Sequence, residues 1–169
     1  MIISGNVIAH KVLRDSAEID DNVSVQLPSI DPITGELKGA GIMGTIDMPV
    51  SGQIGSMTTT INMRSVNKNA AELARPGLHN IELRFVQDVV NASGQLIPQG
   101  TKIYITGVTK KYDPGKIEPP TTMDGSVELE TLRYRQVIDG IEVLLIDKRN
   151  YIYKVNGVDY MQSIRSALG

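Results

Sequence analysis

The chain has 169 residues, of which 41% are hydrophobic, which suits one domain of ordinary size without disulfides. Its 17 basic and 19 acidic residues give a net charge of −2, so the overall charge offers no argument for nucleic acid binding. Because cysteine is absent, a disulfide scaffold, a thiol nucleophile and a cysteine-ligated metal are excluded. With neither a long apolar stretch nor a signal peptide in the sequence, we expect a single domain over residues 1–169, made in the cytosol.

The segment Ser29–Ser56 combines glycines with apolar side chains. It holds six glycines between Gly35 and Gly55, which make order costly because glycine loses the most backbone freedom on folding. So much apolar surface on a long segment is unusual for a soluble monomer. We therefore expect an extension that is buried when subunits assemble. Its candidate contact residues are Leu37, Ile42, Met43, Ile46 and Met48.

Most of the remaining periodic segments predict strands. Apolar and polar residues alternate over 57–63 and 81–85, and residues 101–112 are rich in β-branched residues. The apolar parity changes after Leu129, which predicts a bulge near Glu130–Thr131. Asp139–Gly140 predicts a hairpin turn into residues 141–147, a strand that is apolar on both faces. A further strand is expected over 151–155, and residues 113–125 form an excursion between strands.

Helix is scarce. Residues 68–75 predict one helix, because Ala70, Leu73 and Ala74 share a face, Asn67 can cap it, and Pro76–Gly77 ends it. A second short helix is expected within residues 159–169, with Asp159 as its cap and Met161, Ile164 and Leu168 on one side. The fold class is therefore mainly β with a flanking helix.

No motif in the sequence predicts catalysis. Gly39–Gly44 matches the glycine fingerprint of dinucleotide-binding folds, but neither a buried strand before it nor a helix after it is predicted. Glu128 and Glu130 lie on one face of a strand, which is more typical of a solvated face than of an acid–base pair. We expect no enzyme activity, no metal and no cofactor.

The sequence resembles the major tail tube proteins of contractile-tailed bacteriophages and related phage-tail-like particles. The resemblance begins with the glycine-rich segment Gly35–Gly44 and continues with the helix that ends at Pro76–Gly77 before residues 81–85. Its most specific part is a series of short motifs near the C-terminus: Leu132–Tyr134, Asp139–Gly140, Leu145–Asp147, Lys154–Asp159 and Arg165–Gly169.

The resemblance implies an antiparallel β-sandwich or barrel of two sheets with one flanking α-helix and the glycine-rich extension. It further implies hexameric rings, stacked into a tube inside a contractile sheath, with the Ser29–Ser56 segment reaching the adjacent ring. DNA or a tape-measure protein would occupy the channel, and baseplate and tail terminator proteins would be further partners. The particle would be assembled in the bacterial host cytoplasm, without membrane binding by this protein.

The channel wall is expected to be polar and not strongly basic, because many cationic contacts would hold a polyanion and oppose its passage. The candidate wall residues are Glu82, Arg84, Glu128 and Glu130. Two alternatives remain for the function as a whole. One is a secreted ring or tube protein of a bacterial contractile secretion system, and the other is a small β-barrel ligand-binding module or enzyme.

Overall fold

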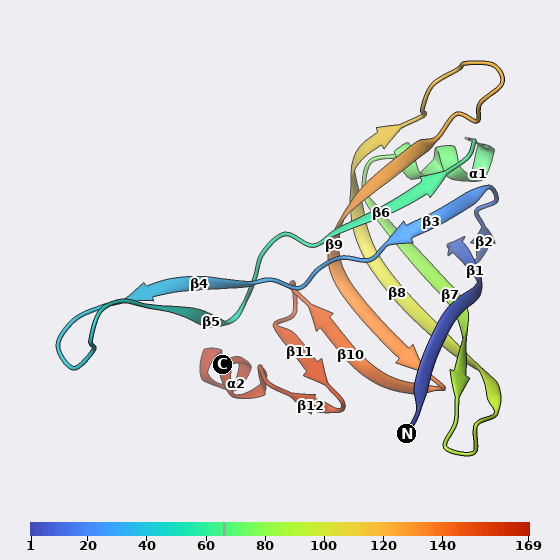
Figure 1. The fold of residues 1–169 in the computed structure, drawn as a ribbon. Helices are drawn as coiled ribbons and strands as arrows, with labels where there is room; N and C mark the ends of the chain where they lie inside the picture. Colours follow the sequence, from blue (N-terminus) through green and yellow to red (C-terminus); the bar gives the residue numbers. More distant parts are fainter. Residues whose placement is uncertain (66) are drawn as a thin grey trace.

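The computed structural model describes residues 1–65 and 67–169, which form one large antiparallel sheet and one small sheet (Figure 1). The large sheet runs in the order β12-β11-β10-β9-β8-β7-β1-β2. In addition, β6 pairs with β9 on one edge and with β3 on the other. Its strands are β1 (Ile3–Arg14), β2 (Ala17–Glu18), β3 (Asn22–Gln26), β6 (Thr58–Met63), β7 (Leu78–Val90), β8 (Leu96–Asp113), β9 (Gly125–Ile138), β10 (Ile141–Asp147), β11 (Ile152–Val155) and β12 (Val158–Asp159).

The long strand β9 organises the sheet. One of its edges pairs with β8 along nearly its whole length, while the other pairs with β6 over residues 125–130 and with β10 over 133–138. The register against β8 shifts between Thr131 and Arg133, so Leu132 is the extra residue of a bulge. The bulge predicted near Glu130–Thr131 is thereby confirmed, and it lets one strand serve two neighbours.

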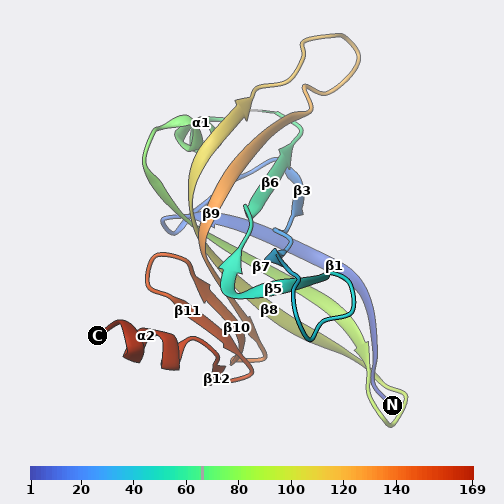
Figure 2. The same cartoon turned by 90° about the vertical axis from the view of Figure 1, so that its left-hand side faces the viewer.

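The sheet curves strongly, so that β3 and β6 pass in front of β7 and β8 (Figures 1 and 2). Buried aliphatic side chains fill the space between these layers, among them Val12, Ile61, Ile81, Ile103 and Leu129. Within the described residues no ladder joins β3 to β1, so the sheet does not close. The mainly β fold of two antiparallel sheets with a flanking helix and an extension is confirmed, and the part of the chain that the structure describes shows no closed barrel.

The predicted hairpin turns are present. Asp139 and Gly140 have φ values of 48° and 77°, and β9 and β10 pair directly on either side of them. β10 lies between β9 and β11, and both Leu145 and Ile146 are buried although they point to opposite faces. The sequence pattern of a strand covered on both faces is confirmed at this end of β10.

The predicted first helix is short. It consists of α1 (Lys68–Ala71) and a 3₁₀ turn, η1 (Glu72–Ala74), and the Asn67 side chain accepts a hydrogen bond from the Ala70 amide. Ala70 and Leu73 are buried, as predicted, but Ala74 is exposed, because the change to 3₁₀ geometry turns it away from the sheet.

The second helix is α2 (Gln162–Leu168) at the C-terminus. Its N-cap position is Met161 rather than Asp159, although the Asp159 carboxylate still accepts a hydrogen bond from the Met161 amide at 3.0 Å. Met161 is buried, whereas Leu168 is exposed and does not share in the expected apolar face. In the described part of the chain, no helix has the length and apolarity needed to span a bilayer.

Candidate assembly surfaces

The glycine-rich segment forms a projecting β-hairpin, which we call the arm. Strands β4 (Pro32–Leu37) and β5 (Ile46–Ile54) pair only with each other and extend away from the large sheet (Figure 1). The tip between them contains Gly41 and Gly44, with φ values of 87° and 93° that an L side chain rarely adopts. The Gly39–Gly44 motif therefore serves a tight loop after an exposed strand, outside any dinucleotide-binding context.

The two faces of the arm differ in polarity. Leu37 is paired with Ile46, and Met48 is opposite Gly35 on the same face. On the opposite face Glu36 is paired with Asp47. Four of the five candidate contact residues are exposed: Leu37, Met43, Ile46 and Met48; Ile42 is half-buried. The arm thus carries an apolar stripe that its own subunit leaves uncovered.

The base of the arm is held against the body by a small number of contacts. The Gly55 amide donates to the Asp31 carbonyl at 2.8 Å, which closes the hairpin. The Lys148 ammonium donates to the Gly55 carbonyl at 2.7 Å. The Met161 side chain lies against Gly52, where a Cβ would force the end of the methionine to move.

The four candidate wall residues lie on one face of the large sheet. Ile81 and Leu83 of β7, like Val127 and Leu129 of β9, point into the core. Since side chains alternate along a strand, Glu82, Arg84, Glu128 and Glu130 all point to the opposite, outer face. From the sequence, the Glu82/Arg84 pair and the Glu128/Glu130 pair were separate candidates for the channel wall. In the fold they are two regions of one surface.

Opposite charges are mixed on this outer face. The Arg84 Nε donates to Glu82 Oε1 at 2.6 Å, and the Lys110 ammonium donates to Glu130 Oε2 at 3.0 Å. Burial acts to raise the pKa of Glu130, but the hydrogen bonds from Ser56 and Lys110 outweigh it and lower that pKa. The surface is polar, and each of these carboxylates is neutralised locally.

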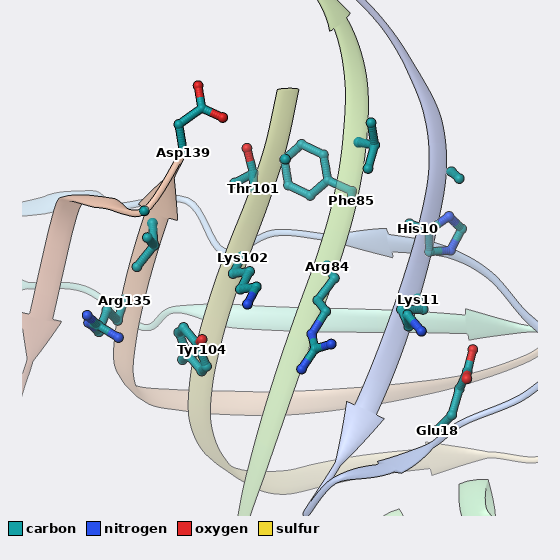
Figure 3. Close-up of a pocket in the computed structure, with 15 residues that line it drawn as sticks. His10, Lys11, Glu18, Arg84, Phe85, Thr101, Lys102, Tyr104, Arg135 and Asp139 are labelled. Atoms are coloured by element: carbon teal, nitrogen blue, oxygen red, sulfur yellow. The ribbon is translucent and has the colours of Figure 1, made fainter. Parts of the chain in front are cut away.

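A shallow groove crosses the same face over β1, β7, β8 and β9, with a volume of about 740 Å³. In it Lys11, Arg84 and Lys102 stand in one register across three adjacent strands, as Figure 3 shows. Arg135 lies 5.3 Å from the centre of the Tyr104 ring, in cation–π contact. This arrangement could contact a polar or anionic surface, but it holds no nucleophile beside a base.

One of the two histidines of the chain has a structural role. His79 is buried; its Nδ1 accepts from the Arg14 Nε at 3.1 Å, and its Nε2 donates to the Arg75 carbonyl at 2.8 Å. Among the described residues, no three His, Asp or Glu side chains are grouped so that they could hold a metal ion. The prominent features are therefore surfaces for contact with other molecules.

Sequence reasoning missed two elements that border these surfaces. β1 spans 12 residues and pairs with β7, yet the sequence predicted no strand before residue 57. The register shifts between Ser4 and Val7 and again between Val7 and Ala9, so strict alternation is lost. The contact between Met161 and Gly52 was also missed, because no sequence pattern pairs residues so far apart.

Comparisons with known proteins agree with this picture. Residues 7–169 match the family "Phage tail tube protein FII". The tail tube protein of Escherichia phage P2 is 24% identical over 149 residues, which is 86% of each chain.

Two solved structures share the fold, both from an extracellular contractile injection system in its extended state. One is the PVC sheath/tube terminator, with a TM-score of 0.53 and 16% identity over 76% of this chain and 92% of that one. The other is the PVC sheath-tube complex, with a TM-score of 0.52 and 16% identity over 76% of this chain and 87% of that one. Since the family match covers almost the whole sequence, the chain belongs to the phage tail tube protein FII family and is a structural protein, not an enzyme.

Proposed function

We propose that the chain is the repeating subunit of the inner tube of a contractile phage tail or tail-like injection particle. In this proposal, subunits form hexameric rings, the rings stack into a tube, and the arm of each subunit reaches the adjacent ring. The observation that carries the proposal is the apolar stripe of the arm, whose residues Leu37, Ile46 and Met48 are each more than 40% exposed. A contact between one patch and a different patch of the next copy generates a continuing stack wherever the rotation between the copies does not close a ring.

Unpaired strand edges support the lateral part of the proposal. Among residues 1–65 and 67–169, the edge of β1 that faces away from β7 has no strand partner over most of its length, because β2 pairs with Leu13 and Arg14 alone. Ile3, Val7 and Ile8 on this strand are exposed. A long apolar edge strand invites pairing with another chain, and here a neighbouring subunit of the ring is the proposed partner.

The outer face of the large sheet is the proposed channel wall. Among its candidate residues Glu82, Arg84, Glu128 and Glu130, Glu82 pairs with Arg84, and Glu130 pairs with Lys110. These carboxylates offset part of the positive charge that Lys11 and Lys102 add to the same face, so we propose a wall that is polar without being strongly basic. Such a wall leaves DNA or a tape-measure protein free to move. A reconstruction of the tube tests this assignment: lysine and arginine outnumbering acids along the axis would overturn it.

We also propose sheath, terminator and baseplate proteins as partners of the tube. The solved structures that share the fold are named for a sheath-tube complex and a sheath/tube terminator. We extend this to a contractile sheath outside the tube and to terminator and baseplate proteins at its ends. The location is then the virion tail or a tail-like particle, assembled in the host cytoplasm.

Electron microscopy of the concentrated, purified protein tests the function. Long hollow tubes with six-fold end views are the expected result. Isolated rings that never stack would favour the secreted ring protein of a contractile secretion system. A monomer that stays compact at all concentrations would overturn the tube.

A further inference from the structure

The direction of the arm is set by few contacts. The arm forms its own two-stranded sheet, and within the described residues its strands make no ladder with the large sheet. Two chain connections join it to the body, and one hydrogen bond, from the Gly55 amide to the Asp31 carbonyl, closes its base. A hairpin attached in this way can pivot as a unit unless side chains from the body hold it.

Met161 is one of the side chains that hold the arm. It is only 5% exposed, and its thioether lies against the backbone of Gly52 in β5. Gly52 has a φ of 69°, and it also leaves the space that Met161 occupies. Because position 52 has no side chain, the side chain of Met161, which is distant in the sequence, can pack against the β5 backbone there.

Met161 is itself fixed in place by an ion pair. Asp159 Oδ1 accepts from the Met161 amide at 3.0 Å, while the other carboxylate oxygen pairs with Arg165 of α2. The same guanidinium donates to the Tyr151 carbonyl at 2.7 Å. The start of α2 is thus tied both to β12 and to the turn between β10 and β11.

Lys148 holds the arm from the same turn. Its amide donates to the Leu132 carbonyl at 3.0 Å, which anchors the residue at the bulge of β9. Its ammonium reaches out to the Gly55 carbonyl at 2.7 Å. Met161 and Lys148 therefore contact β5 and the residue after it from one rigid part of the body.

We infer that Lys148, Asp159, Met161 and Arg165 form a brace that fixes the direction of the arm, so that Met161 and Lys148 are positioning residues for the contact between copies. The statement that the arm contacts another copy rests on the proposed function, whereas the fixing of its direction does not. A rigidly directed arm loses less conformational freedom on docking, so a held arm binds its neighbour more tightly than a free one.

Distances between two spin labels test the brace in the isolated subunit. Because the chain has no cysteine, Asp47→Cys in strand β5 of the arm and Lys102→Cys on β8 can be labelled selectively. We expect one narrow distance distribution in the otherwise unchanged chain. Met161→Ala should broaden it at least about twofold, and Lys148→Ala should act in the same direction. Met161→Leu, which keeps the volume, should restore the narrow distribution.

A matched control separates positioning from stability. Met63→Ala removes an equally buried methionine from β6, far from the arm base, and should lower the melting temperature without broadening the distribution. An unchanged width in Met161→Ala, or the same broadening in Met63→Ala, would overturn the brace. Tube formation is followed separately by electron microscopy of the unlabelled chain. Its failure would reject the proposed function, whereas the label distances decide on the brace in either case.

Discussion

The hydroxyl groups of Thr59 and Thr131 lie 2.7 Å apart, and both side chains are fully buried. Thr59 belongs to β6, and Thr131 lies beside the bulge of β9. The Thr131 amide donates to the Met57 carbonyl at 2.8 Å, so side chains and backbone join the two strands at one place. A buried polar pair at this position fixes the point at which β9 leaves β6 and begins to pair with β10.

Removing both members of this pair should cost less than the sum of the two single removals. Thr131→Val leaves the Thr59 hydroxyl buried without its partner, and we expect a loss of about 1–3 kcal/mol in the free energy of unfolding. The double variant Thr59→Val/Thr131→Val should lose clearly less than the sum of the two single variants. Urea unfolding measures all three. Thr106→Val, at an exposed hydroxyl bonded to Asn80, is the control and should change stability by less than about 0.5 kcal/mol. Additive losses in the double variant would contradict the role given to the pair.

Local patterns in the sequence predicted the parts of the fold that depend on neighbouring residues. Asp139–Gly140 and Asn156–Gly157 form turns with positive φ values, and the change of parity in β9 marks a real bulge. β1 was missed because its bulges break the alternation. Whether the sheet closes depends on pairing between β1 and β3, which no local pattern encodes, so the sequence left sandwich and barrel as alternatives.

The candidate surfaces were predictable to a similar extent. The apolar residues of the arm were identified because glycine-rich sequence and apolar side chains rarely occur together. Their arrangement as a two-faced hairpin follows from the register of Leu37 with Ile46, which the sequence alone did not predict. The brace joins Gly52 to Met161, and such long-range contacts emerge only when the chain is folded.

Met43 at the tip of the arm offers the most direct test of stacking. It is fully exposed in the subunit, so Met43→Asp should leave the free energy of unfolding unchanged within about 0.5 kcal/mol. If the tip is buried between rings, an unpaired carboxylate there should prevent tubes at concentrations where the unchanged chain forms them. Electron microscopy and sedimentation measure assembly, and thermal unfolding measures stability. Ile117→Asp is the matched control, because Ile117 is 88% exposed on the other long loop. If Met43→Asp formed normal tubes, the arm tip would not be part of the contact between rings.

The stability of the subunit should depend on pH through Glu130. Its folded-state pKa is lowered below the ordinary value of 4.5, because the hydrogen bonds from Ser56 and Lys110 outweigh the effect of burial. A group of this kind stabilises the fold fully above its unfolded pKa and loses that contribution as pH falls through the folded value. Glu130→Gln should therefore cost up to about 1 kcal/mol at pH 7, since the pair is partly exposed, and the difference should disappear as the pH falls through the lowered folded-state pKa. Urea unfolding at several pH values measures it. Glu118→Gln, in an exposed pair with Lys116, should show a much smaller difference at pH 7.

Hydrogen exchange should show where assembly adds order. In the part of the isolated subunit that the structure describes, the amides of residues 35–54 are protected by the ladder between β4 and β5 and by a loop hydrogen bond from the Ile42 amide to the Gly39 carbonyl. Fixing such a segment costs roughly 1–2 kcal/mol per residue, which burial of the apolar stripe against a neighbour would offset. We expect the largest gain in protection on tube formation within residues 35–54, while β8 and β9, paired along their length, should change little. Mass spectrometry of proteolytic fragments from subunit and tube gives the comparison. Equal protection of residues 35–54 in both states would mean that the arm is already fully ordered alone, and that the contact between rings lies elsewhere.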